Sequence, residues 1–63
     1  MSMDDLLKPH QLATRWEMST ASLAQWRYLG RGPAYFKVGA NVRYKLADVL
    51  AYEDANTVKP GAA

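Results

Sequence analysis

Residues 19–33 read STASLAQWRYLGRGP and contain one helix together with the signals that begin and end it. Ser and Thr are suited to the start of a helix, because their side-chain oxygens accept hydrogen bonds from the first free backbone N–H groups. Leu23, Ala24, Trp26 and Leu29 then recur mostly on one side at helical spacing. Gly30 is expected to end this helix.

A shorter helix is predicted before it, from Pro9 to Glu17. Proline is tolerated at the first helical position, because its missing N–H would be unpaired there in any case. Leu12, Ala13 and Trp16 form a one-sided apolar stripe at helical period. Two helices joined by a short turn, the second opening on a Ser/Thr cap, are typical of a helix-turn-helix.

A β-hairpin is predicted after the second helix, from the segments 35–38 and 42–44. Both alternate in residue type and are rich in β-branched and aromatic side chains. Gly39-Ala40-Asn41 between them predicts a three-residue loop, or a two-residue turn beside a bulge. The helical pattern returns from Leu46 to Tyr52. The expected order is helix, helix, hairpin, helix, which is a mostly α fold with a β-hairpin.

The chain of 63 residues has room for a single small domain. We expect residues 1–7 to form an arm, in which Leu6-Leu7 is an anchor or a very short strand, residues 8–56 to form the domain, and residues 57–63 to form a disordered tail. Replacement of either tryptophan by alanine should lower the free energy of unfolding by about 3–5 kcal/mol. The expected core consists of Trp16, Leu23, Trp26, Phe36, Val42, Leu46, Val49 and Leu50.

The composition argues against several classes of function. Cysteine is absent and there is one histidine, which excludes disulfides and the usual zinc sites and leaves no Ser-His-acid constellation for catalysis. We therefore expect no enzyme, no metal or cofactor and no small-molecule ligand. A domain this small usually needs a supplement, and a partner is the one that remains. No segment approaches the roughly 20 apolar residues that span a bilayer, and the chain does not open with a basic and then apolar signal segment. The sequence therefore predicts a cytoplasmic protein with no membrane contact.

Charge is separated along the chain. No acidic residue lies between Met18 and Ala47, whereas that segment carries five cations, Arg27, Arg31, Lys37, Arg43 and Lys45. A segregated basic segment is the electrostatic signature of a polyanion binder, although a solvated face of a small protein gives the same pattern.

These features together resemble the winged helix-turn-helix of the excisionase and MerR-like superfamily, over roughly residues 6–55. Small phage or integrative-element excisionases and AlpA-type regulators are the most similar members. Two departures stand out, since many members have glycine at Glu17-Met18 and charged residues at Tyr28-Leu29. The resemblance rests on Leu7, Pro9, Leu12-Ala13, residues 19–23, Trp26-Arg27, residues 30–33, residues 35–39, residues 42–44 and Asp48-Val49.

The resemblance implies double-stranded DNA as partner, with the second helix in the major groove and the hairpin as a wing against the backbone or minor groove. Glutamine can pair with adenine and arginine with guanine or phosphate. Thr20 has a second interpretation as the helix cap, and Gln25 as a solvated position. The candidate contacts in the second helix are Thr20, Ala21, Ser22, Gln25 and Arg27.

The loop and wing supply the remaining candidates, which are Arg31, Lys37, Asn41, Arg43 and Lys45. Alternation along each strand places Lys37 opposite Phe36 and Arg43 opposite Tyr44, so we expect both cations on the face away from the core. Contact with phosphates is one interpretation, and a charged edge that prevents aggregation is the other.

The leading functional hypothesis is an architectural DNA-binding protein, a recombination directionality factor. It would be bacterial or phage-encoded and nucleoid-associated, and would bind adjacent sites in several copies, bend DNA and direct an integrase towards excision. A small transcriptional regulator of the same fold is the alternative. A protein-binding winged helix is a further one, in which Tyr28 and Leu29 contact the partner, unless Leu29 packs beneath the wing.

Overall fold

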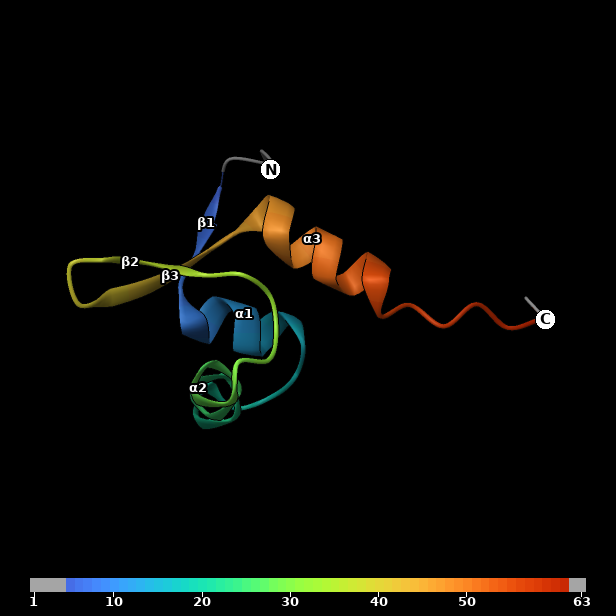
Figure 1. The fold of residues 1–63 in the computed structure, drawn as a ribbon, viewed down its shortest axis with the longest axis horizontal. Coiled ribbons are helices and arrows are strands. Elements are labelled where there is room, and N and C mark those ends of the chain that lie inside the picture. Colours follow the sequence, from blue (N-terminus) through green and yellow to red (C-terminus); the bar gives the residue numbers. More distant parts are fainter. Residues whose placement is uncertain (1–4, 62–63) are drawn as a thin grey trace.

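The computed structural model describes residues 5–61 and arranges them as three helices beside a three-stranded antiparallel sheet (Figure 1). The fold is therefore mixed α/β, whereas the sequence predicted a mostly α fold with a hairpin. The predicted helices and hairpin are all present, and Leu6-Leu7 adds a strand. The elements are β1 (Leu6–Leu7), α1 (Pro9–Arg15), α2 (Thr20–Leu29), β2 (Phe36–Val38), β3 (Asn41–Lys45) and α3 (Leu46–Ala55), and the strand order is β1-β3-β2.

The strand register divides the sheet into two faces. Leu7 pairs with Tyr44 and Lys37 with Val42, and paired residues of antiparallel strands lie on the same face. The face that holds Tyr44, here called the inner face, packs against the helices. The outer face carries Leu6, Phe36, Val38, Asn41, Arg43 and Lys45.

The hairpin closes through a two-residue turn. Val38 pairs directly with Asn41, which leaves Gly39 and Ala40 as the turn residues. Gly39 has a φ of 63°, and a glycine with positive φ at the first central position is typical of a type II′ turn. Of the two alternatives that the sequence left open, the two-residue turn is confirmed, and the regular register contains no bulge.

The connection between α1 and α2 departs from the prediction in two ways. α1 ends at Arg15 rather than Glu17, and Glu17 adopts a φ of 53°, a left-handed conformation in which glycine is more usual. The backbone N–H of Met18 donates to the carbonyl of Ala13 at 2.9 Å, which helps to hold this turn. Ser19, not Thr20, caps α2, because its Oγ accepts from the backbone N–H of Ser22 at 3.0 Å.

The ends of the chain agree only partly with the expected boundaries. α3 continues to Ala55, beyond the predicted end at Tyr52, and the Asn56 side chain donates to the Tyr52 carbonyl at 2.8 Å. Residues 57–61 form no helix or strand. The rest of the predicted tail, residues 62–63, and residues 1–4 of the predicted arm lie outside the described residues.

The core lies between the inner face of the sheet and the three helices. Three of the eight predicted core residues, Leu23, Leu46 and Val49, are buried, whereas the other five are half-buried. Tyr44 was missing from the predicted set, although it is among the largest side chains that are fully enclosed. The buried hydrophobic residues are Leu12, Ala13, Leu23, Tyr44, Leu46 and Val49.

Three aromatic rings join the helices at the edge of this core. The ring centroids of Trp16 and Tyr52 lie 5.4 Å apart, and that of Trp26 lies 6.3 Å from each of the other two. These separations fall in the range in which tilted rings attract one another. One ring comes from α2, one from α3 and one from the residue that caps α1, so the cluster connects all three helices.

A carboxylate fastens α1 to α3 beside these rings. Glu53 accepts two hydrogen bonds from Arg15, at 2.7 Å from Nε and 2.9 Å from the second guanidinium nitrogen, and a third at 2.6 Å from the Trp16 indole N–H. These bonds, those from Arg15 first, lower the pKa of Glu53 to about 2. The ionised carboxylate therefore stabilises the folded chain.

Because the pKa of Glu53 is lowered in the folded chain, the free energy of unfolding should depend on pH. Its contribution is complete above the ordinary glutamate pKa of about 4.3 and is lost as the pH falls towards 2. Glu53→Gln should reduce the free energy of unfolding near neutral pH by about 1 kcal/mol, since the pair is partly exposed. It should also flatten the loss of stability on acidification, as measured by thermal unfolding near pH 7 and pH 3. Asp54→Asn on the same helix is the control, and an acid dependence unchanged in Glu53→Gln would contradict the assignment.

The loop after α2 offers a second test of packing. Gly32 has a φ of 86°, and a Cβ at this position would lie 3.0 Å from Cε3 of Trp26. Gly39 also has positive φ but open space around it. Gly32→Ala and Gly39→Ala should each lower the free energy of unfolding by about 1 kcal/mol, because alanine is strained at positive φ. Gly32→Ala should lower it by a further ~1–2 kcal/mol, because its Cβ clashes with Trp26. Urea unfolding followed by tryptophan fluorescence would measure this, and equal losses in the two variants would contradict it.

Candidate nucleic-acid interface

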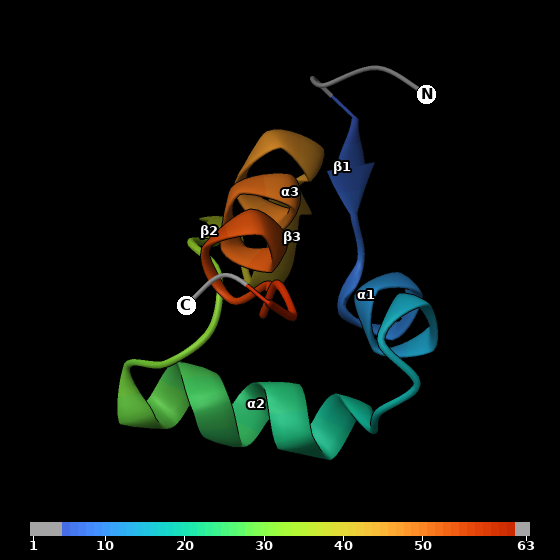
Figure 2. The same ribbon diagram turned by 90° about the vertical axis from the view of Figure 1, so that its right-hand side faces the viewer.

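α2 forms one side of the molecule. In Figure 2 it runs along the lower edge of the fold, with α1, the sheet and α3 all on its other side. Leu23 is buried and Trp26 and Arg27 are half-buried, so these three residues mark the inward side of the helix. The outward side carries an exposed stripe at the spacing i, i+3, i+4, i+7, which consists of Ala21, Ala24, Gln25 and Tyr28. Ala24 therefore does not share the inward side with Leu23 and Trp26, where the sequence placed it.

The exposed stripe has no charged side chain. Arg27 is the one charged residue among the 10 residues of α2, and it lies on the inward side. Tyr28, which the sequence suggested as a protein contact, is 84% exposed and shares the stripe with the candidate DNA contacts Ala21 and Gln25. Leu29 beside it is 50% exposed, so it is not buried beneath the hairpin.

Arg27 points towards the sheet and is held there by two contacts. One guanidinium nitrogen donates to the hydroxyl of Tyr44 at 2.7 Å. The guanidinium carbon also lies 5.8 Å from the centre of the Tyr35 ring, within the range of a cation–π contact. The structure therefore does not bring Arg27 together with Gln25, as the sequence-based set of helix contacts assumed.

The two hydroxyl candidates lie at the start of α2. Thr20 is its first residue and is exposed, whereas Ser22 is half-buried. The Oγ of Ser22 lies 2.9 Å from that of Ser19, the capping residue. Ser22 thus takes part in the helix start, and Thr20 is the more accessible of the two to a ligand.

The predicted wing contacts fall on two different faces. Phe36 pairs with Arg43, so Lys37 and Arg43 lie on opposite faces of the hairpin, and the expectation that they share a face is wrong. Alternation fixes the faces within one strand but does not say which residues of two strands are partners. Lys37 is on the inner face, the side of the sheet on which the helices lie.

The outer-face candidates are Asn41, Arg43 and Lys45. Asn41 is exposed next to the turn. Arg43 is half-buried and donates to the carbonyl of Val42 at 2.7 Å. The Nζ of Lys45 lies 5.7 Å from the centre of the Phe36 ring. Both cations therefore lie partly against the hairpin itself.

The cations of the acid-free segment and the acids that follow it lie on different elements. Within residues 5–61, Arg15 forms an ion pair with Glu53, whereas Arg31 and Lys37 form none with a carboxylate. α2, the loop and the hairpin all come from the segment without acids, whereas Asp48, Glu53 and Asp54 lie on α3. Figure 1 shows the hairpin and α3 extending to opposite sides of the fold.

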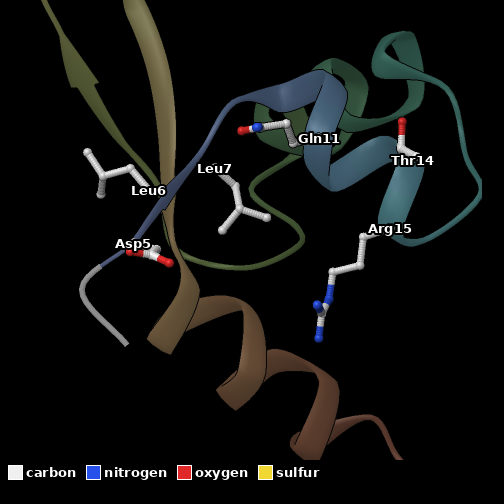
Figure 3. A pocket seen from close by; sticks show the side chains of 6 residues that line it. All are labelled: Asp5, Leu6, Leu7, Gln11, Thr14 and Arg15. Atoms are coloured by element: carbon white, nitrogen blue, oxygen red, sulfur yellow. The ribbon is translucent and has the colours of Figure 1, made fainter. Parts of the chain in front are cut away.

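A hollow between β1 and α1 lies apart from these residues (Figure 3). Leu6 and Leu7 point to opposite sides of the strand, and Arg15 reaches towards α3, where it bonds Glu53. Gln11 is also engaged, because it accepts from the backbone N–H of Lys8 at 2.8 Å. Two of the polar groups lining the hollow are thus used in holding the fold together.

No protein-family model, curated protein or solved structure matches this chain. None of the helices in the described residues has the length and apolar character to cross a bilayer. Over the same residues, no three His, Cys, Asp or Glu side chains are grouped as a metal site requires.

The contacts of Arg27 predict a structural cost for its removal. Arg27→Ala would leave the buried hydroxyl of Tyr44 without its donor, which should lower the free energy of unfolding by about 1–3 kcal/mol. Gln25→Ala, on the exposed stripe two residues away, should change it by less than about 0.5 kcal/mol. Urea unfolding of both variants measures the difference. Equal stability of the two variants would show that Arg27 has no role in holding α2 to the sheet.

Proposed function

We propose that this chain is a sequence-specific DNA-binding protein of the winged helix-turn-helix type. In this proposal α2 enters the major groove of double-stranded DNA, and the β2–β3 hairpin acts as a wing. The observation that supports it is the position of an accessible, uncharged helix face beside unneutralised cations, in a part of the chain that has no acids. Uncharged polar groups suit base edges, and cations suit the phosphates on either side.

The dimensions of α2 suit this role. Its 10 residues span about 15 Å, and the major groove, about 12 Å wide, admits one α-helix. Arg31 directly follows the end of α2, and Lys37 extends from the inner face of the hairpin, so each is available to a phosphate beside the groove. Thr20, exposed at the helix start, can donate its hydroxyl to a phosphate or a base.

The biological role proposed is that of an excisionase-like architectural factor, on the strength of the sequence resemblance. A domain this small makes few contacts alone, so several copies on adjacent sites would supply the affinity. Bound in a row they would bend the DNA and favour excision by an integrase. A transcriptional regulator would use the same surface, and the excisionase-like role is the one of the two that requires the bound DNA to be bent.

Binding and bending are testable with the purified chain. Fluorescence anisotropy with mixed-sequence duplexes at several salt concentrations should give an affinity that falls steeply with salt, because displaced counterions drive phosphate contact. Circularly permuted DNA fragments then report bending by their electrophoretic mobility. Salt-dependent binding without bending would favour the regulator. Absence of binding at low salt would overturn the proposal and favour a protein partner for Tyr28 and Leu29.

The two faces of the hairpin predict unequal effects of two lysine substitutions. Lys37→Ala should reduce the slope of log affinity against log salt by about 0.9, the value for one lost phosphate contact, and should weaken all sequences alike. Lys45→Ala is the matched control, because Lys45 lies on the outer face against Phe36 and should leave the slope nearly unchanged. If the slope responds to Lys45 and not to Lys37, the outer face is the one that meets the DNA.

A further inference from the structure

We propose that the exposed stripe of α2 selects adenine–thymine base pairs, with Gln25 reading an adenine and Ala21 and Ala24 contacting the methyl groups of thymines. This inference rests on the proposed function and adds to it the chemical class of the DNA site. It follows from the side chains that α2 exposes on the stripe and from the inward orientation of Arg27.

Gln25 is the one side chain of the stripe that carries a donor group and a separate acceptor atom side by side, in the plane of its carboxamide. Adenine presents the complementary pair in the major groove, an acceptor at N7 and a donor at the N6 amino group. Guanine presents two acceptors there, so the glutamine oxygen would face another oxygen or nitrogen lone pair. Cytosine offers a single donor. Adenine is thus the base that satisfies both groups of the carboxamide.

Ala21 and Ala24 flank Gln25 on the stripe and place methyl groups at the helix surface. Their small size lets the helix backbone approach the base edges. An alanine methyl contacts the C5-methyl of thymine favourably, since both are apolar and release water on contact. Either thymine, the partner of the adenine read by Gln25 or one in a neighbouring pair, presents this methyl in the same groove.

Because Arg27 points inward, α2 does not present the side chain that most often binds guanine. Arginine binds the O6 and N7 of guanine with two donors, and Arg27 is the single arginine of α2. Its guanidinium instead donates to Tyr44 and lies over Tyr35, on the inward side of the helix. The stripe also lacks Asp and Glu, the residues that accept from cytosine.

Tyr28 completes the stripe with a role that does not depend on sequence. It is 84% exposed and lies one turn beyond Ala24 and Gln25, towards the end of α2. A tyrosine hydroxyl can donate to a phosphate oxygen. Tyr28→Phe should therefore weaken binding to all duplexes alike and leave the base preference unchanged.

The test begins with selection of bound duplexes from a random pool, using the full chain, followed by affinity measurements on the selected site. The expected site contains an A·T pair at which Gln25→Ala loses about 5- to 150-fold in affinity and most of its preference among the four base pairs. Uracil in place of a contacted thymine, which removes only the methyl group, should weaken binding by about 2- to 4-fold, the effect of one buried methyl group or less.

Gln25→Glu is the matched variant, because it keeps the shape but replaces the donor by a second acceptor. It should exchange the preference for adenine at that position for cytosine, which donates from N4. Binding that is salt-dependent but has the same base preference in Gln25→Ala, or a selected site of G·C pairs, would overturn this inference and leave the proposed function in place. If no duplex is bound at low salt, both are overturned.

Discussion

The hydroxyl of Tyr44 is the polar group around which this fold is organised. The side chain is 1% exposed, at the centre of the sheet, and a hydroxyl enclosed in this way is costly unless it is hydrogen-bonded. Arg27 supplies the bond from α2. One helical residue pointing inward fixes the rotation of the whole helix about its axis, because successive residues are about 100° apart. With Arg27, Trp26 and Leu23 inward, Gln25 and Tyr28 necessarily lie outside.

A second set of contacts holds the helices to one another at the edge of the core. The rings of Trp16, Trp26 and Tyr52 bring three helices together, and Glu53 ties the end of α1 to α3 through Arg15 and the Trp16 indole. Four side chains in the core are less than 2% exposed, a small number on which to hold a fold. The half-buried rings and the bidentate ion pair thus supplement the small core, whereas a larger domain is stabilised mainly by its buried side chains.

Local patterns were sufficient to predict the elements but not how they pair. The start of α2 near Ser19 and its end at Gly30 follow from residues that cap and terminate helices, and both were predicted. The register of the hairpin was not, because alternation is satisfied equally by pairings one residue apart, which exchange the faces of one strand. The error over Lys37 and Arg43 has this cause. The inward turn of Arg27 was also missed, since it depends on Tyr44, 17 residues away.

The inward and outward sides of α2 are under different constraints during evolution. Leu23, Trp26 and Arg27 are constrained by the fold, whereas Ala21, Ala24, Gln25 and Tyr28 are exposed and lie outside the core cluster. Substitutions on the outward side, other than those to proline or glycine, should therefore change the free energy of unfolding little, whatever they do to binding. A lineage of such chains could drift from one partner sequence to another through single exposed replacements, without passing through unstable intermediates and with the scaffold unaltered.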